Sequence, residues 1–139
     1  MPKKIMYFQK GERIIREGRL DKRMYIILEG NVKISLSDGD ESIIVANLKR
    51  GDFFGEMSLF NNTPRSATAT ADGDVKLAYI DNIKQLKAFL MVNPTFAAKM
   101  VHILALRLAR TNEILVNEFK ELNKYKFMRD VSGLHYFVD

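Results

Sequence analysis

The chain contains no cysteine, and this absence excludes several kinds of site at once. Without thiols there is no disulfide, no thiolate metal site and no iron–sulfur cluster, so nothing favours a small secreted fold held by disulfides. The two histidines, His102 and His135, have no potential ligand partners close to them in sequence. They fit packing or surface roles better than a metal site, and we expect no bound metal.

Long apolar runs are also missing. No stretch approaches the roughly 20 residues that a helix needs to cross a bilayer, and the N-terminal MPKKIMYFQKGE has too few apolar residues for a signal-peptide core. There is no nucleophile–base pair, no metal-ligand spacing and no G-x-x-x-x-G-K loop. The sequence therefore predicts a soluble, cytoplasmic protein that is not an enzyme and has no membrane partner.

What the chain does contain is enough apolar sequence for one core. Its 139 residues are 47% hydrophobic, which suits a single domain and hardly two. The net charge of +5 is compatible with an anionic ligand, with nucleic acid or simply with solubility, so charge does not decide between them.

Glycines separate short β-branched and aromatic runs over the first 80 residues. Short strands bounded by turns at this spacing predict an all-β sandwich or barrel, and Asp38-Gly39 carries a hairpin signal. The expected strands are residues 5–8, 13–15, 24–28, 31–36, 42–48, 66–71 and 75–80.

After Asp81 the pattern becomes helical. We expect a short helix over about 82–92 and a long one over about 94–123, with proline tolerated at its start. A heptad row predicts a coiled-coil seam, and a second apolar row lies beside it. The seam is Val101, Leu104, Leu108, Thr111, Leu115, Glu118, Leu122 and Tyr125, and the second row is Phe96, Met100, Ile103 and Ile114. Two apolar faces favour a parallel homodimer over a helix that only covers its own barrel.

One stretch, GDFFGEMSLFNNTPRSATATA at residues 51–71, combines a glycine bend, a carboxylate, a short helix and a lone arginine. A single helical turn is stable only when packed. Its N–H groups and the Arg65 fork attract a phosphate, while Glu56 suits a sugar hydroxyl. Taken singly, Glu56 fits a helix-start acid and Arg65 a solvated surface charge better than a ligand site, but the combination favours a ligand site.

This stretch resembles the phosphate-binding cassette of cyclic-nucleotide-binding domains, found in catabolite-activator-type regulators, in regulatory subunits of cyclic-AMP-dependent protein kinase and in gated channels. Phe54-Gly55-Glu56-Met57-Ser58-Leu59 and Pro64-Arg65-Ser66-Ala67 match both halves of that pattern. The similarity reaches about Phe119. It implies an eight-stranded jelly-roll β-barrel, mainly β, followed by a short and a long helix.

The resemblance also implies roles for individual residues. Glu56 would hold the ribose 2′-hydroxyl and Arg65 the exocyclic oxygens of the cyclic phosphate, with close backbone contacts from Gly55, Ser66 and Ala67. Thr111 and Asn112 resemble the regulator-helix residues that meet the adenine amino group. The candidate ligand-binding residues are Phe54, Gly55, Glu56, Met57, Ser58, Arg65, Ser66, Ala67, Thr111 and Asn112.

A cyclic AMP receptor is the function that the resemblance favours. The branch selective for cyclic GMP places threonine after the arginine, where Ser66 stands here, so cyclic AMP is preferred and cyclic GMP remains possible. We expect residues 1–123 to form the sensor, with the barrel over about 5–81. We expect the tail 124–139 to pack on the barrel or a partner, and the signal to pass to an unknown downstream protein. DNA is an unlikely partner because no recognition helix remains. The alternatives are an interaction module with a vestigial pocket, or the sensor of a larger regulator.

Overall fold

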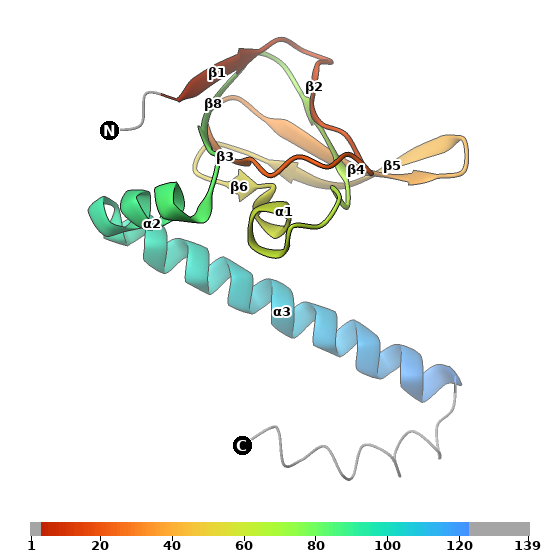
Figure 1. The fold of residues 1–139 in the computed structure, drawn as a ribbon. Coiled ribbons are helices and arrows are strands. Elements are labelled where there is room, and N and C mark those ends of the chain that lie inside the picture. Colours follow the sequence, from red (N-terminus) through yellow and green to blue (C-terminus); the bar gives the residue numbers. More distant parts are fainter. Residues whose placement is uncertain (1–3, 123–139) are drawn as a thin grey trace. The chain divides into compact units, whose positions relative to one another are not determined.

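The computed structural model describes residues 4–122, and the chain divides into two compact units, 1–92 and 93–139. The first unit holds all the described strands and two helices, and the second holds one long helix (Figure 1). The predicted tail, 124–139, lies outside the described residues.

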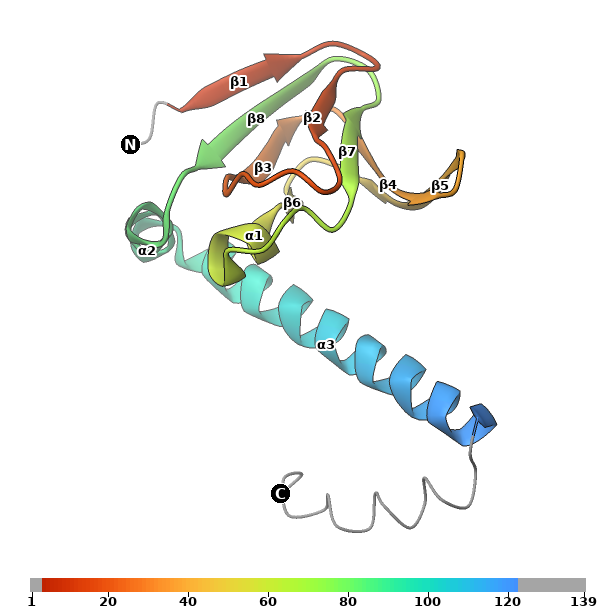
Figure 2. The ribbon, with the colours of Figure 1, turned by 45° about the vertical axis from the view of Figure 1, so that its right-hand side comes forward.

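The first unit is a roll of two antiparallel four-stranded sheets. One sheet has the order β1-β8-β3-β6 and the other β2-β7-β4-β5, so both join strands that are distant in sequence (Figure 2). The strands are β1 (Ile5–Phe8), β2 (Arg13–Ile15), β3 (Met24–Glu29), β4 (Val32–Asp38), β5 (Glu41–Leu48), β6 (Phe53–Phe54), β7 (Thr68–Ala71) and β8 (Val75–Ile80). The strand pattern predicts a sandwich or barrel, and this roll is the jelly roll that the resemblance implies.

The core of this unit is built from the inward faces of both sheets. β3 is buried over four successive residues because it lies between β8 and β6 at the centre of its sheet. The largest fully buried side chains are Met24, Ile27, Val32, Phe53 and Leu77. Burial of such side chains is the main stabilising contribution to the fold, at about 1.5–3 kcal/mol each.

Two strand predictions need correction. β6 was not expected, because Phe53 and Phe54 are only two residues between a turn and a helix; it forms by pairing with Tyr25 and Ile26 of β3. β7 begins at Thr68 rather than at residue 66, since the chain before it is held by the 17–19 loop instead of by a neighbouring strand.

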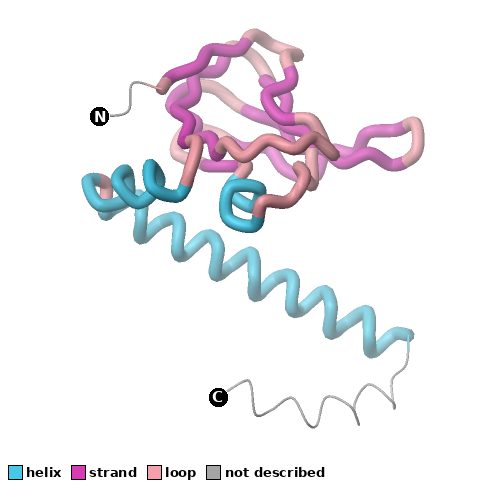
Figure 3. The backbone as a smooth tube through the Cα atoms, viewed as in Figure 1, coloured by secondary structure: helices cyan, strands magenta, loops and turns pink. Residues whose placement is uncertain are grey.

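Three helices accompany the strands in the described part of the chain (Figure 3). α1 (Glu56–Asn61) interrupts the β-region and ends at Asn62, whose φ of 55° is left-handed. α2 (Ile83–Val92) starts where expected, and the Asn82 side chain accepts the Gln85 N–H at 2.9 Å. α3 (Pro94–Leu122) forms the second unit's described part. Within the described residues, no single helix is long and apolar enough to cross a membrane; only α2 taken together with Pro94–Asn117 passes that test, as a bent pair.

Candidate functional site

The segment of residues 51–71, called the cassette below, is anchored in its first half to the central strand β3. The Ile27 N–H donates to the Asp52 carbonyl and the Gly51 N–H donates to the Ile27 carbonyl, each at 2.9 Å. The Phe54 ring stacks on Tyr25 with centroids 5.3 Å apart. These contacts place the start of α1 at a fixed position against the core.

Gly55, the residue before α1, occupies a place where no side chain fits. Its φ is +84°, a left-handed conformation that glycine adopts without a steric penalty. A Cβ here would lie 2.7 Å from the Arg23 carbonyl oxygen and 2.8 Å from Nη1 of Arg65. The backbone of Gly55 therefore lies directly against the arginine of the cassette.

Arg65 is buried, with only 3% of its surface exposed. Its Nη1 donates to the Gly55 carbonyl at 2.9 Å, its Nη2 donates to the Arg23 carbonyl at 2.5 Å, and Nη2 also pairs with the Asp21 carboxylate. Arg65 is thus a built-in part of the site and not a solvated surface charge.

One donor of that guanidinium remains unused. Among the residues that the structure describes, Nε of Arg65 is the buried side-chain polar atom with no hydrogen-bond partner. Leaving such a group unpaired costs about 1–3 kcal/mol. A cationic donor kept buried at this cost is suited to an anionic ligand.

The backbone of Arg65 is fixed as well. Its carbonyl accepts the Gly18 N–H at 2.8 Å, and its N–H donates to the Arg19 carbonyl at 2.9 Å. The Thr68 hydroxyl accepts the Glu17 N–H at 3.0 Å just beyond it. The second half of the cassette is therefore held by the 17–19 loop, as the first half is held by β3.

The other predicted cassette residues differ in exposure. Glu56 is the first residue of α1 and is 6% exposed, and Ser58 and Phe54 are also buried. Met57 and Ser66 are exposed, and Ala67 is half-buried. The structure thus brings Phe54, Gly55, Glu56 and Arg65 to one place, while Ser66 lies at the surface.

Thr111 and Asn112 lie on α3 in the second unit, and both are exposed. The Thr111 hydroxyl donates to the Arg107 carbonyl of the preceding turn at 2.9 Å. Their role as base readers stays a prediction.

Two residues of the site were missed by the sequence analysis. Asp21 and Arg23 hold the Arg65 guanidinium, yet they lie 44 and 42 residues before it. Nothing in the local pattern around Asp21 marks it, because a single exposed aspartate in a loop is common. Only the folding of the 18–23 segment against the cassette gives these residues their place.

A group of charges lies beside the site around Asp81. Its carboxylate accepts Nε of Arg23 at 2.8 Å and also pairs with Lys4. The hydrogen bond from Lys4 lowers the pKa of Asp81; burial opposes this shift, and Arg23 reinforces it. Burial lowers the pKa of Arg23, but the hydrogen bond and charge of Asp81 outweigh it, so that pKa is raised.

Burial raises the pKa of Tyr25, and the negative charge of Asp21 adds to the effect. The hydroxyl of Tyr25 therefore stays protonated through the neutral range. The stacked rings of Tyr25 and of Phe54, which directly precedes Gly55 in the chain, are thus an uncharged aromatic surface.

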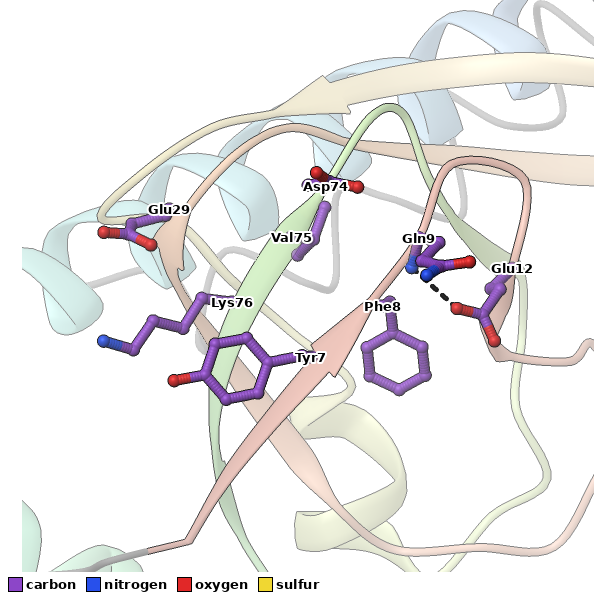
Figure 4. Close-up of a pocket in the computed structure, with 8 residues that line it drawn as sticks. All are labelled: Tyr7, Phe8, Gln9, Glu12, Glu29, Asp74, Val75 and Lys76. Carbon is purple, nitrogen blue, oxygen red and sulfur yellow. Dashed lines mark hydrogen bonds between the residues drawn. The ribbon is translucent and has the colours of Figure 1, made fainter.

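A cleft of about 580 Å³ lies in the first unit (Figure 4), and none of its lining residues belongs to the 51–71 segment. Its lining comes from β1, β8 and the segments next to them: Tyr7, Phe8, Gln9, Glu12, Glu29, Asp74, Val75 and Lys76. The Glu12 carboxylate is engaged by the Gln9 N–H at 2.6 Å. In the part of the chain that the structure describes, no group of three or more histidine, aspartate or glutamate residues is arranged to hold a metal.

Comparison with known proteins gives one consistent result. Residues 5–93 match the cyclic nucleotide-binding domain family. The chain is 33% identical over 112 residues to a CRP-like cAMP-activated global transcriptional regulator of Mycobacterium tuberculosis, covering 79% of this chain and 49% of the regulator. This chain therefore spans about half the length of the curated relative it matches.

Solved structures agree with this result. The catabolite activator protein of Thermus thermophilus superposes with a TM-score of 0.72 at 28% identity, covering 85% of this chain and 56% of that one. The EAL enzyme Bd1971 in its cGMP-bound form is similar, with a TM-score of 0.58 and 31% identity over 76% of this chain and 28% of that one. Its cAMP-bound form has a TM-score of 0.54 and 28% identity over 79% of this chain and 33% of that one. A transcriptional regulator, a catabolite activator protein and an EAL enzyme are thus all similar to this chain.

Proposed function

The chain belongs to the cyclic nucleotide-binding domain family, and on that premise we propose that it is a receptor that binds cyclic AMP in preference to cyclic GMP. The observation that carries the proposal is Arg65, buried at 3% exposure with its Nε donor unpartnered among the described residues. A buried cation with a spare donor is what a cyclic phosphate requires.

The residues present fit such a ligand. Arg65 would donate from Nε to the phosphate oxygens while Nη1 and Nη2 stay with their protein partners. Glu56, buried one residue after Gly55, supplies a carboxylate for the ribose 2′-hydroxyl. The missing side chain at Gly55 lets the backbone come close to the arginine and to the ligand.

The preference for cyclic AMP rests on Ser66, which stands where a threonine marks selectivity for cyclic GMP in the family. Ser66 keeps a hydroxyl and is exposed, so discrimination between the two nucleotides is modest. We assign the reading of the base to Thr111 and Asn112 on α3.

The output of binding is a population shift. Ligand contacts order α1, and the conformation of the helices that follow changes with it. This conformational change passes the signal to a separate protein. α3 provides the surface for a homodimer, because its seam residues Val101, Leu108 and Leu115 are 69%, 63% and 49% exposed. A second copy of this seam would cover them in a parallel coiled coil.

Thermal unfolding with cyclic AMP, cyclic GMP, AMP and no ligand tests the proposal. Ligand at one hundred times its dissociation constant stabilises the native state by about 2.7 kcal/mol, which raises the midpoint clearly. We expect this rise with cyclic AMP, a smaller one with cyclic GMP and none with AMP. No rise with either cyclic nucleotide refutes the receptor and leaves an interaction module with a vestigial pocket.

An arginine variant tests the assigned role directly. Arg65→Ala should weaken binding by about 2–5 kcal/mol, because the ligand's phosphate would lose a buried charged partner. Arg50→Ala, at an exposed arginine outside the site, is the matched control and should bind normally. Calorimetry on folded protein measures both, and full affinity in the Arg65 variant would contradict the role.

A further inference from the structure

We infer that Arg23 is a positioning residue that links the cassette to the start of α2, an inference that rests on the proposed function. The main-chain carbonyl of Arg23 accepts Nη2 of Arg65. Its side chain binds Asp81, which lies just before α2. One residue thereby contacts both the proposed phosphate-binding arginine and the residue that leads into the helix after the roll.

The cassette end of this link is tightly defined. The Arg23 carbonyl oxygen lies 2.5 Å from Nη2 of Arg65 and would lie 2.7 Å from a Cβ at Gly55. An anion bound at Nε of Arg65 therefore changes the charge next to the hydrogen bond that this carbonyl accepts. Arg23 leads straight into the buried strand β3, so its backbone has little freedom to absorb the change elsewhere.

The helix end is equally well defined. The Arg23 guanidinium lies 4.2 Å from the centre of the Tyr79 ring, and its Nε donates to Asp81 at 2.8 Å. The Asp81 N–H donates to the Gln85 side chain, and the Gln85 N–H donates to the Asn82 side chain, each at 2.9 Å. Asp81 is therefore part of the capping arrangement that begins α2.

Stability alone does not explain this arrangement. The side chains of Arg23 and Asp81 are 41% and 32% exposed, and exposed ion pairs contribute about 0–1 kcal/mol to folding. The pair also lies next to a second pair, between Lys4 and the other oxygen of Asp81. What distinguishes Arg23 from Lys4 is the bond that its carbonyl accepts from the cassette.

Lys4 therefore provides a matched control. It pairs with the same carboxylate at a similar side-chain exposure of 36%, and its described contacts include none with the cassette. Arg23→Gln and Asp81→Asn break the link while keeping the main-chain carbonyl and the helix start. Lys4→Gln removes an ion pair of the same kind and leaves the link in place.

Hydrogen exchange of the α2 amides, with and without cyclic AMP, is the decisive measurement, and calorimetry supplies the affinity. Wild type and Lys4→Gln should show a ligand-dependent change in residues 83–92, while Arg23→Gln and Asp81→Asn lose it but keep protection in residues 51–71. Because the Arg23 backbone that accepts Nη2 of Arg65 is then positioned less firmly, the dissociation constant should rise about fivefold in the Arg23 and Asp81 variants and less than twofold in Lys4→Gln.

The outcomes separate the two proposals. If wild type binds no cyclic nucleotide, the receptor function fails and this inference fails with it. If wild type binds but α2 does not respond, or if Arg23→Gln responds as wild type does, the link alone is overturned. Equal losses in Arg23→Gln and Lys4→Gln also overturn it, since the effect would then be general to the ion pairs.

Discussion

Replacing Gly55 with alanine should weaken both the fold and ligand binding, because the new methyl group would enter the space occupied by the cassette arginine. Two costs combine at this position. The backbone has a φ of +84°, where an L-residue costs about 1–2 kcal/mol. The Cβ would also lie 2.7 Å and 2.8 Å from the Arg23 oxygen and Nη1 of Arg65, so one of these groups must move.

The second cost arises because one of these two groups must move to make room for the Cβ. The Arg23 oxygen is backbone, whereas Nη1 belongs to a side chain that donates to the Gly55 carbonyl at 2.9 Å. A hydrogen bond of a charged group contributes about 1.5–3 kcal/mol. We therefore expect Gly55→Ala to lower the free energy of unfolding by about 2.5–5 kcal/mol. With Arg65 displaced, affinity for cyclic AMP should fall about tenfold or more, equivalent to about 1.4 kcal/mol.

Gly11 supplies the control, because its φ is +89° and a Cβ there would meet nothing within 4 Å. Gly11→Ala should carry the backbone cost alone, about 1–2 kcal/mol, with unchanged affinity. Urea unfolding and calorimetry on both variants measure the two effects. Equal losses of stability, or normal cyclic AMP binding by Gly55→Ala, would refute the assignment of Gly55 to the site.

Three further predictions follow from individual side chains. The pKa of Asp81 is lowered in the fold, so its ion pairs stabilise the protein above the unfolded pKa of about 3.9, and this stabilisation is lost as pH falls through the lower folded pKa. The difference in free energy of unfolding between wild type and Asp81→Asn should therefore shrink from pH 7 to pH 3 in urea unfolding. A constant difference would contradict this. Ser66→Thr should raise affinity for cyclic GMP relative to cyclic AMP in competition calorimetry, and an unchanged ratio would remove Ser66 from selectivity. Leu108→Glu, at a seam position that is 63% exposed, should give a monomer in analytical ultracentrifugation where wild type is a dimer, whereas a monomeric wild type would contradict the coiled coil.

The strands and helices were largely predictable from local pattern. Turn glycines and β-branched runs placed β1, β3, β5 and β8 within a residue or two of where they lie, because each of these strands carries its own apolar sequence. β6 was not predictable in this way. Two phenylalanines make a strand only when a partner such as Tyr25 is beside them, and a partner that is distant in sequence leaves no local signal.

The sequence by itself determined an all-β first part, the helices that follow it and the pairing of Glu56 with Arg65 in one stretch, because spacing and residue type are local properties; the jelly roll was what the resemblance implied. Tertiary structure alone decided that Arg65 is buried and held by Asp21 and Arg23, and that its Nε is left unpaired among the described residues. The physical reason is that burial and hydrogen bonding at Arg65 depend on a segment more than 40 residues away. Folding brings that segment to the arginine, and no periodicity in the chain records the contact.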